Sequence, residues 1–393
     1  MRIWKSIKDW LRENDVFSID HLMVCLIVAL LCILLGWLSL NLSLFSPVKR
    51  AFDDFAMTDV YYEMHSRPDK EMNNDIVLVD MTELVSRGEI ADVIDSINAC
   101  EPKVLLVDLI FQHETEHPLD DAKIAEVEGR VKNGVFSCKL TDYSESKKQF
   151  SNVVYSFFKD YASNVDWAYS NVHEKRAAGC VREFSLSQNS VDGPMYSIPY
   201  LAACKYRDIK PTQADYNMRI IVFDDTDFPE VNHKDVMKNK NILKGKIVLL
   251  GTMHEEADMH ITPIGKMPGM KLQAYSIISY MEHPNVRVMS LKWSLILAFI
   301  VSYLSAWMGL MLKRKFPNTY LHVIKVYYFM LAALLVWAGF ICFMKFDYNI
   351  QLLYPLLAAA LVEESRHLYK WLISYLSSHN KLKIAKKSVY AVK

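Results

Sequence analysis

The chain has no excess of charge of either sign. Its 393 residues include 45 lysines and arginines against 45 aspartates and glutamates, and neither half is strongly basic. Binding to nucleic acid depends on a basic patch or stripe that neutralises phosphates. The composition therefore gives no support for that function, and we expect no nucleic-acid partner.

Glycine is also scarce, with 12 residues, and Gly245 and Gly251 are isolated glycines. Phosphate-binding loops and dinucleotide-binding turns need closely spaced glycines at the start of a helix. The sequence has neither motif, and we expect no cofactor. It also has no internal repeat and no low-complexity tract.

What the chain does contain is four hydrophobic runs, at residues 22–45, 291–312, 326–344 and 350–373. A helix needs about 20 apolar residues to cross a membrane. The fourth run is the weakest, because its apolar stretch is short before Glu363. The pattern predicts four transmembrane helices, one before and three after a largely polar segment at residues 46–290.

The distribution of lysine and arginine predicts the orientation of these helices. Basic residues precede the first run, lie between the second and third runs, and follow the fourth, whereas Lys49 and Arg50 are a minority on the other side. By the positive-inside rule both termini are cytoplasmic. Residues 1–21 then form a cytoplasmic amphipathic segment, residues 374–393 form a basic tail, and residues 46–290 are extracytoplasmic. The expected location is the bacterial inner (cytoplasmic) membrane.

The first run has a second interpretation, a cleaved signal peptide. Its apolar core is longer than the usual signal-peptide core, and it lacks a clear small-x-small cleavage site. We therefore interpret it as an uncleaved membrane anchor.

Short, continuous apolar runs in the polar segment are typical of buried parallel strands. A β-α-β order requires a parallel pair with a right-handed crossover. We therefore predict an α/β extracytoplasmic domain with a largely parallel sheet, and residues 139–184 as an insertion with short strands. The expected strands are Ile76–Asp80, Val104–Phe111 and Ile247–Gly251, and the expected helices are Glu89–Cys100, Asp120–Val131 and Leu272–Met281.

Four cysteines fall in the extracytoplasmic segment: Cys100, Cys138, Cys180 and Cys204. An oxidising compartment permits disulfides among them, with three connectivities. The sequence is equally compatible with one disulfide and with none, since Cys100 ends a predicted helix and fits a core position.

Several blocks of residues resemble, in order, one family of sensory domains. The blocks are Ile76–Asp80 (IVLVD), Val107–Phe111 (VDLIF), Ala178–Arg182 (AGCVR), Tyr196–Ala203 (YSIPYLAA), Lys244–Gly251 (KGKIVLLG), Asp258, Thr262–Pro263, Pro268–Gly269 and Gln273–Ala274. Together they resemble the second type of CHASE domain (cyclase/histidine-kinase-associated sensory extracellular). The resemblance covers about residues 50–285 and includes one span before the domain and three after it.

The resemblance implies a sensory role with output at the cytoplasmic side. The family usually continues into a cytoplasmic cyclase, kinase or phosphatase, whereas only Leu368–Lys393 follow the last span here. That stretch is too short for a catalytic domain. We therefore expect output through a separate protein partner, in the membrane or in the cytoplasm.

Polar side chains follow the predicted strands at their carboxyl ends, where open parallel sheets bind ligands. A pocket there, with His260 in the same loop as Asp258, could hold a small polar ligand or a divalent metal. The alternative is that the aspartates cap loops and the histidines are solvated. The candidate ligand-binding residues are Asp80, Asp108, His113, His254, Asp258 and Thr262.

Residues His113–His117 read HETEH, a formal match to the zinc-protease pattern H-E-x-x-H. That chemistry needs both histidines on one face of a helix. Here the motif follows a predicted strand and Pro118 closes it, so we expect a solvated loop. A metal site at His113 and His117 is the weaker alternative, and we expect no enzymatic activity.

Four charged residues interrupt the fourth run: Glu363, Glu364, Arg366 and His367. Charge inside a membrane is costly and usually functional. These residues are candidates for a relay or for contact with a partner helix. The alternative is that they lie among the lipid headgroups.

The leading hypothesis is a receptor-like membrane protein that senses a ligand or an envelope condition and signals through a partner. The alternative is a structural or scaffolding subunit of a membrane complex, and a membrane metalloenzyme built on HETEH is a third. Membrane lipid is an expected partner, and a homo-oligomer is compatible with the sequence.

Overall fold

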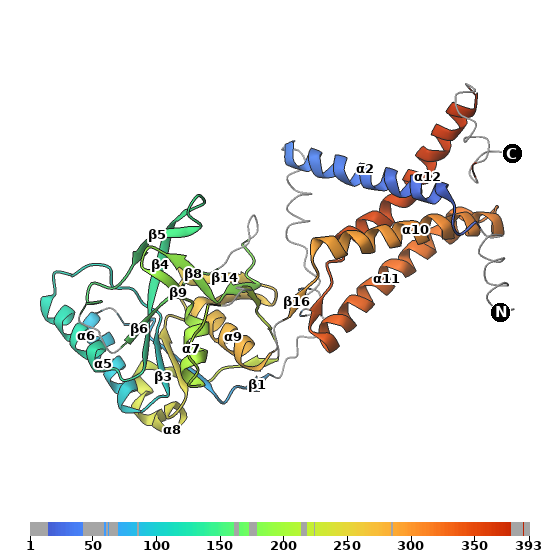
Figure 1. Cartoon of the computed structure of the whole chain (residues 1–393). Helices are drawn as coiled ribbons and strands as arrows, with labels where there is room; N and C mark the ends of the chain where they lie inside the picture. Colours follow the sequence, from blue (N-terminus) through green and yellow to red (C-terminus); the bar gives the residue numbers. More distant parts are fainter. Residues whose placement is uncertain are drawn as a thin grey trace. The chain divides into compact units, whose positions relative to one another are not determined.

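The apolar runs of the polar segment become strands of one sheet in a computed structural model of the chain (Figure 1). The structure describes residues 15–41, 59, 62, 70–84, 86–160, 165–172, 179–213, 218–223, 225–283, 286–378 and 388. The chain divides into two units, Thr58–Val286 and a helical unit made of Met1–Met57 with Arg287–Lys393. The predicted amphipathic segment and most of the basic tail lie outside the described residues.

The α/β unit is built on a mixed, mostly parallel sheet, as predicted. The described strands of this sheet follow the order β12-β2-β13-β3-β4-β5-β8-β9, and β6 pairs with β4. Pairing is parallel from β12 to β4 and antiparallel between β4 and β5. The bounds are β12 Glu230–Asn232, β2 Ile76–Asp80, β13 Ile247–Gly251, β3 Val104–Val107, β4 Gly134–Ser144, β5 Gln149–Val154, β6 Val165–Tyr169, β8 Ser187–Ser190 and β9 Gly193–Tyr196.

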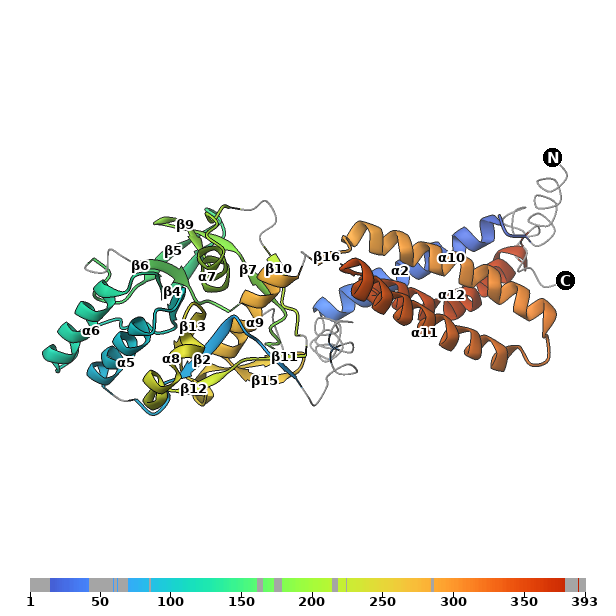
Figure 2. The same ribbon diagram turned by 90° about the horizontal axis from the view of Figure 1, so that it is seen from below.

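Helices cover both faces of the parallel part of the sheet (Figure 2). α5 (Arg87–Ala99) and α6 (Pro118–Arg130) pack on one face, and α7 (Ile198–Tyr206) and α9 (Gly269–Glu282) pack together on the other. Side chains alternate between the faces of a strand, so strands buried on both sides must be apolar throughout. Complete burial of each such Val, Leu or Ile stabilises the fold by about 1.5–3 kcal/mol.

Two expectations about strands need correction. The second strand, β3, ends at Val107 rather than at Phe111, because the amide of Phe111 donates to the Ser156 hydroxyl at 3.1 Å and its carbonyl accepts from Phe157. The segment 139–184 is not merely an insertion. β4 pairs in parallel with β3 and β6 pairs in parallel with β4, so both strands extend the central sheet.

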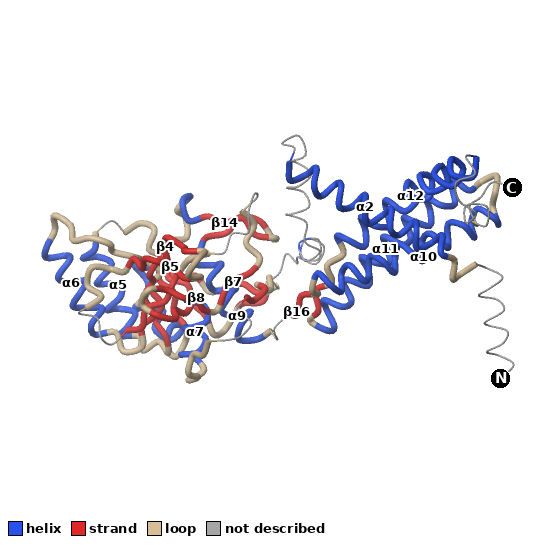
Figure 3. Tube along the Cα trace, turned by 45° about the horizontal axis from the view of Figure 1, so that its top comes forward, coloured by secondary structure: helices blue, strands red, loops and turns tan. Residues whose placement is uncertain are grey.

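The central sheet appears in Figure 3 as red tube between blue helices, and the remaining described strands are short. They form two-stranded pairs outside the central sheet. The pairs are β1 (Glu71–Met72) with β11 (Thr226–Asp227), β7 (Glu183–Ser185) with β10 (Met218–Ile220), β14 (Met259–Thr262) with β15 (Gly265–Pro268), and β16 (Arg287–Val288) with β17 (Tyr348–Asn349). A short helix α8 (Lys240–Leu243) precedes β13.

The helical unit contains α2 (Ile19–Asn41), α10 (Leu291–Lys315), α11 (Tyr320–Phe346) and α12 (Leu353–Ser378). α2 and α12 pack on α10 and on each other through small and β-branched side chains, whereas α11 is largely exposed. α10 and α11 are long and apolar enough to cross a membrane, and the apolar part of α2 within the described residues is shorter.

No disulfide joins the described cysteines. Cys100, Cys138 and Cys204 are buried, with at most 1% of each side chain exposed. Cys100 also caps the C-terminus of α5. These cysteines therefore act as small apolar residues of the core.

Candidate functional site at the carboxyl edge of the sheet

Three parallel strands bring the candidate aspartates to one edge of the sheet. β13 lies between β2 and β3, with Gly251 opposite Asp80, and the amide of Asp108 donates to Leu250 at 2.9 Å. Gly251 is fully buried, and a Cβ there would lie 3.2 Å from the Met270 sulfur and 3.7 Å from the Asp108 Cβ. The missing side chain lets α9 pack closely on this edge.

Asp80 organises the turn after β2. Its Oδ1 accepts from the amide and hydroxyl of Thr82 at 3.0 and 2.5 Å, and from the amide of Met253 at 3.3 Å. His254 lies next to it, with Nε2 3.8 Å from Oδ2, but its side chain is 75% exposed. These hydrogen bonds connect the loop after β2 to the loop after β13. Asp80 therefore has the structural role that was expected as the alternative to ligand binding.

Asp108 stands at the end of β3 in a less polar setting. Its Oδ1 accepts from the Ser137 hydroxyl of β4 at 2.6 Å. Burial raises the pKa of Asp108 and the nearby carboxylate of Asp258 raises it too, against the Ser137 hydrogen bond and His260, which lower it, so that the pKa is about 6. Burial outweighs the hydrogen bond because desolvation penalises the charged form.

Asp258 lies against the N-terminus of α9, at the end of a 3₁₀ turn (Glu256–Asp258). A Cβ on Gly269, the first residue of α9, would lie 2.6 Å from Asp258 Oδ1, so only glycine leaves room for this carboxylate. The partial positive charge of a helix N-terminus favours an anion there. His260 Nε2 is 3.6 Å from the same Oδ1. Asp108, Asp258 and His260 thus form a mixed acid and imidazole cluster.

A family model for the CHASE2 domain matches residues 24–310 of the chain. The chain belongs to the CHASE2 domain family. Searches of curated proteins and of solved structures gave no match. CHASE2 domains are sensory extracellular domains, so the edge cluster belongs to a sensory domain.

The other candidate residues of this CHASE2 domain lie apart from that cluster or serve the backbone. The Thr262 hydroxyl donates to the carbonyl of Gly265 at 2.6 Å and so closes the β14–β15 hairpin. His113 is exposed, and its carbonyl accepts from Arg87 at 2.7 Å. Among the described residues, none forms a hydrogen bond or ion pair with the His113 side chain.

The HETEH segment is a loop that ends where α6 begins, at Pro118. Asp121 holds this loop, because its carboxylate accepts from the Thr115 amide at 2.5 Å and from the Arg87 guanidinium at 2.6 Å. These bonds lower the pKa of Asp121 although burial opposes them. His113 and His117 therefore do not share a helical face. Among the described residues, no group of three or more histidine, cysteine, aspartate or glutamate side chains is placed so that it could hold a metal ion.

Replacement of Glu114 tests whether this loop has a chemical role. Glu114→Gln should leave the thermal unfolding temperature and the zinc content of the purified full-length chain unchanged, since Glu114 is exposed and lies in a loop. Differential scanning fluorimetry and metal analysis would measure both. Zinc that is bound by the wild-type chain and lost in the variant would restore the metalloenzyme hypothesis.

Ser137, whose hydroxyl donates to Asp108, was not among the sequence candidates. Ser137 was missed because β4 had not been assigned to the parallel sheet, although GVFSC at its start is short and mostly apolar. His260 follows Asp258 by two residues. It was expected in the loop with Asp258, and the structure places it in β14 (Met259–Thr262), just after the 3₁₀ turn that ends at Asp258.

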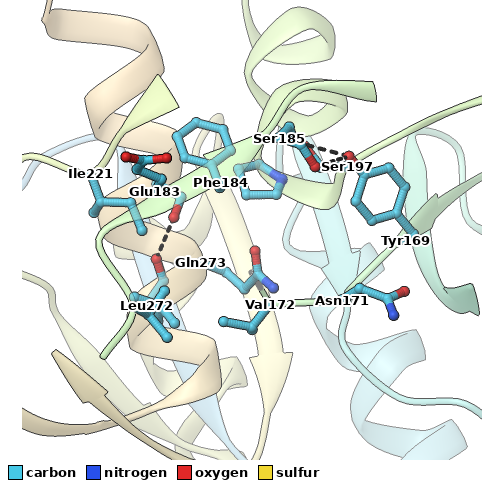
Figure 4. Close-up of a pocket in the computed structure, with 13 residues that line it drawn as sticks. Tyr169, Asn171, Val172, Glu183, Phe184, Ser185, Ser197, Ile221, Leu272 and Gln273 are labelled. Atoms are coloured by element: carbon cyan, nitrogen blue, oxygen red, sulfur yellow. Dashed lines mark hydrogen bonds between the residues drawn. The ribbon is translucent and has the colours of Figure 1, made fainter. Parts of the chain in front are cut away.

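None of the residues that line the cavity in Figure 4 belongs to the edge cluster. It has a volume of about 20 Å³, enough for one water molecule but not for a metabolite. The Tyr169 hydroxyl, at its wall, lies 2.7 Å from the Ser185 hydroxyl. Polar side chains of Asn171, Glu183 and Gln273 also line it. The cavity fits a buried water better than a sensed ligand.

The four relay candidates divide between the inside and the outside of the helical unit. Arg366 is buried, and its guanidinium donates to Glu363 Oε2 at 2.6 Å. The Tyr320 hydroxyl donates to Glu363 Oε1 at 2.9 Å and accepts from Arg366. Glu364 and His367 are exposed. His367 Nε2 nevertheless lies 3.4 Å from Glu363 Oε1, so His367 adjoins the buried ion pair at the surface of the helical unit.

The raised pKa of Asp108 predicts a measurable pH dependence. The folded state holds the proton more tightly than the unfolded state, so this residue lowers stability as the pH rises from 3.8 to about 6. Asp108→Asn keeps an acceptor for Ser137 and removes the charge. The variant should be more stable than the wild type by about 3 kcal/mol at pH 7.5 and equal to it at pH 3.5.

Hydrogen exchange of the β2, β3 and β13 amides in the full-length chain would measure this difference at the two pH values. Asp142→Asn is the matched control, since Asp142 is an exposed aspartate of the same unit. An equal gain for Asp108→Asn at both pH values would show that the carboxyl does not titrate as predicted.

Proposed function

We propose that this CHASE2 protein is a receptor-like membrane sensor whose α/β unit faces the extracytoplasmic side and whose output passes through a separate protein. The observation that carries the proposal is the family match itself. It runs without interruption from α2 through the whole α/β unit into α10. The sensory fold and its flanking helices are therefore one family unit rather than a soluble domain with unrelated helices.

The proposed topology has four spans, α2, α10, α11 and α12, with both termini in the cytoplasm of a bacterium. Two of these helices meet the length and composition of a span by themselves. The other two are supported by their packing on α10 and by the positive-inside distribution of lysine and arginine. Exposed leucine, phenylalanine and tryptophan side chains on all four helices suit contact with lipid.

Sensing would take place at the edge cluster of Asp108, Asp258 and His260. A small polar ligand, or a change of protonation, alters the charge held between β3 and the N-terminus of α9. Asp258 contacts Gly269 directly, so a change there acts on the first turn of α9. A ligand that binds one arrangement of α9 better than another shifts the population between them.

The relay would use the ion pair of α12. Glu363 and Arg366 connect α12 to Tyr320 at the start of α11, and Arg366 also lies against Gly309 of α10. A shift of one of these helices would therefore alter its contacts with the other two. The exposed Glu364 and His367 are available to a helix of the partner or of a second copy of the chain. We assign no metal, cofactor or catalytic residue.

Membrane topology is the first test. Single cysteines introduced at Val191 and at Lys393 should react with a membrane-impermeant maleimide from opposite sides of sealed cells or vesicles. Val191 is 55% exposed, so the reagent can reach it. Reaction of both positions from the same side would contradict the four-span arrangement.

A second measurement separates a sensor from a scaffold. Proteins that co-purify with the intact chain from its native membrane would be identified, and the activity and amount of the bound partner compared between the wild type and Asp258→Asn. A sensor predicts changed partner activity at an unchanged amount of bound partner. Activity that simply follows the amount bound would favour the structural or scaffolding role.

A further inference from the structure

The end of the helical unit where α10, α11 and α12 meet carries a concentration of cations. Lys313 lies in the last turn of α10, Tyr320 begins α11, and Arg366 and Lys370 lie one turn apart on α12. The ammonium groups of Lys313 and Lys370 are close enough to interact directly. Lys313 Nζ lies 5.9 Å from the centroid of the Tyr320 ring, and the Arg366 guanidinium carbon lies 5.7 Å from it.

The one carboxylate of this cluster is already engaged. Glu363 accepts from Arg366 and from the Tyr320 hydroxyl, and His367 Nε2 lies 3.4 Å from its other oxygen. Within the described part of the chain, no carboxylate lies within ion-pair distance of Lys313 or Lys370. Two ammonium groups held side by side repel each other, and an anion placed between them converts repulsion into attraction.

A close contact between α10 and α12 lies next to the two lysines. The Arg366 guanidinium lies over Gly309, where a side chain would collide with it, so α10 and α12 approach closely at this level. Lys313 and Lys370 each follow by four residues, which places them one helical turn further along the same two helices. The packed glycine and arginine therefore set the spacing of the two lysines.

Aromatic side chains mark the depth of the cluster in the membrane. Trp371 and Tyr375 follow Lys370 on α12, are 62% and 45% exposed, and stack with ring centroids 5.9 Å apart. Exposed tryptophan and tyrosine gather at the level of lipid headgroups. Basic pockets between transmembrane helices at this level bind anionic headgroups.

We propose that Lys313 and Lys370, beside the Tyr320 ring, bind the phosphate of an anionic phospholipid headgroup at the cytoplasmic membrane surface. The proposal rests on the four-span topology given above. A bound lipid would hold the ends of α10 and α12 together and so favour one packing of the helices. The anionic lipid content of the membrane would thereby change the population of that packing.

The test uses the full-length chain in nanodiscs that contain phosphatidylcholine alone or with phosphatidylglycerol. Native mass spectrometry and a thermal unfolding series would report bound lipid and stabilisation. Lys313→Gln with Lys370→Gln should weaken phosphatidylglycerol binding about 30-fold, at about a fivefold loss for each lysine near the membrane surface. Lys313→Arg with Lys370→Arg should keep binding and confirm that the glutamine variant fails through charge.

The matched control is Lys315→Gln with Lys325→Gln, which removes the same charge from exposed lysines near the same ends of α10 and α11. This control should retain at least half of the wild-type affinity. An equal loss in the control would overturn the proposal, because binding would then reflect surface charge alone. Stabilisation by inorganic phosphate or glycerol phosphate to the same extent would reassign the site to a soluble anion.

Absence of any preference for phosphatidylglycerol over phosphatidylcholine would also overturn it. These outcomes do not depend on signalling, since lipid binding is measured on the purified chain. A failure of partner output with normal lipid binding would count against the proposed function and not against this site.

Discussion

Replacement of Glu128 by methionine should stabilise the α/β unit by about 3 kcal/mol at pH 7. Glu128 is fully buried in α6, and no residue within the described ranges forms a hydrogen bond with either of its carboxylate oxygens. Burial alone raises the pKa of this group to about 9, so the folded chain carries it protonated at neutral pH. For each pH unit above the unfolded-state pKa and below the folded-state pKa, the free energy of unfolding falls by about 1.4 kcal/mol.

The sign of the pH dependence follows from the raised pKa. The folded state binds the proton more tightly, so the wild-type free energy of unfolding should fall as the pH rises from 4.5 towards about 9. Above pH 6 the Asp108 contribution is complete and Glu128 dominates the slope. Hydrogen exchange of core amides at pH 6, 7 and 8 would show a slope in the wild type that Glu128→Met abolishes.

Glu126→Met is the control for this substitution, because Glu126 lies on the same helix with its side chain 71% exposed and pairs only loosely with Arg130 at 3.8 Å. It should change the stability by less than about 0.5 kcal/mol. Glu128→Gln should also remove the slope, with a smaller gain, since a buried amide still lacks a partner. A less stable Glu128→Met variant with an unchanged slope would mean that Glu128 is ionised and paired in the folded chain.

Replacement of Arg366 by leucine should destabilise the helical unit by about 3–5 kcal/mol, the usual cost when one partner of a buried ion pair is removed. The Arg366 side chain is 1% exposed, whereas Glu363 would lose its closest cation. The double variant Glu363→Gln with Arg366→Leu should recover part of the loss, because it leaves no uncompensated charge. Unfolding in mixed micelles with increasing sodium dodecyl sulfate would measure the three variants.

Arg314→Leu provides the comparison on the same side of the helical unit. Arg314 pairs with Asp15 at 2.7 Å, but the two side chains are 45% and 33% exposed. An exposed pair contributes at most about 1 kcal/mol. Equal losses for Arg314→Leu and Arg366→Leu would show that burial does not distinguish the two pairs and that Arg366 is not held as described.

The central sheet was predictable where strands are apolar throughout. Ile76–Asp80 and Ile247–Gly251 form strands with the predicted bounds, because a strand covered on both faces leaves a continuous apolar signal. β4 gave no such signal. Its first five residues are buried, whereas Leu140 is the only buried residue among the six that follow, so a buried pattern gives way to an alternating and then exposed one. The place of β4 beside β3 in the parallel sheet therefore became known only from the hydrogen-bonded pairing in the structure.

The candidate site was predictable in part for the same reason. Parallel strands put Asp80, Asp108 and the loop to Asp258 on one edge, which strand order alone implies. The exposure of His113 depended on Asp121 and Arg87, two residues from separate helices whose contact no local pattern encodes. The burial of Glu128 was not predicted, because a glutamate in an amphipathic helix is normally expected to face solvent. Its position four residues after the buried Ile124 nevertheless places it on the buried face of α6.

The pairing of β16 with β17 has a mechanical consequence. Arg287 and Met289, which follow α9 in the chain and precede α10, donate their amides to Asp347 and Asn349 in the connection between α11 and α12. A displacement of residues 287–289 would therefore act on the start of α10 and, through these hydrogen bonds, on the connection between α11 and α12. α2 joins the α/β unit through a separate stretch of chain. The start of α10 is thus tied to the α11–α12 connection by backbone hydrogen bonds, whereas α2 is held to α10 and α12 by the packing of side chains.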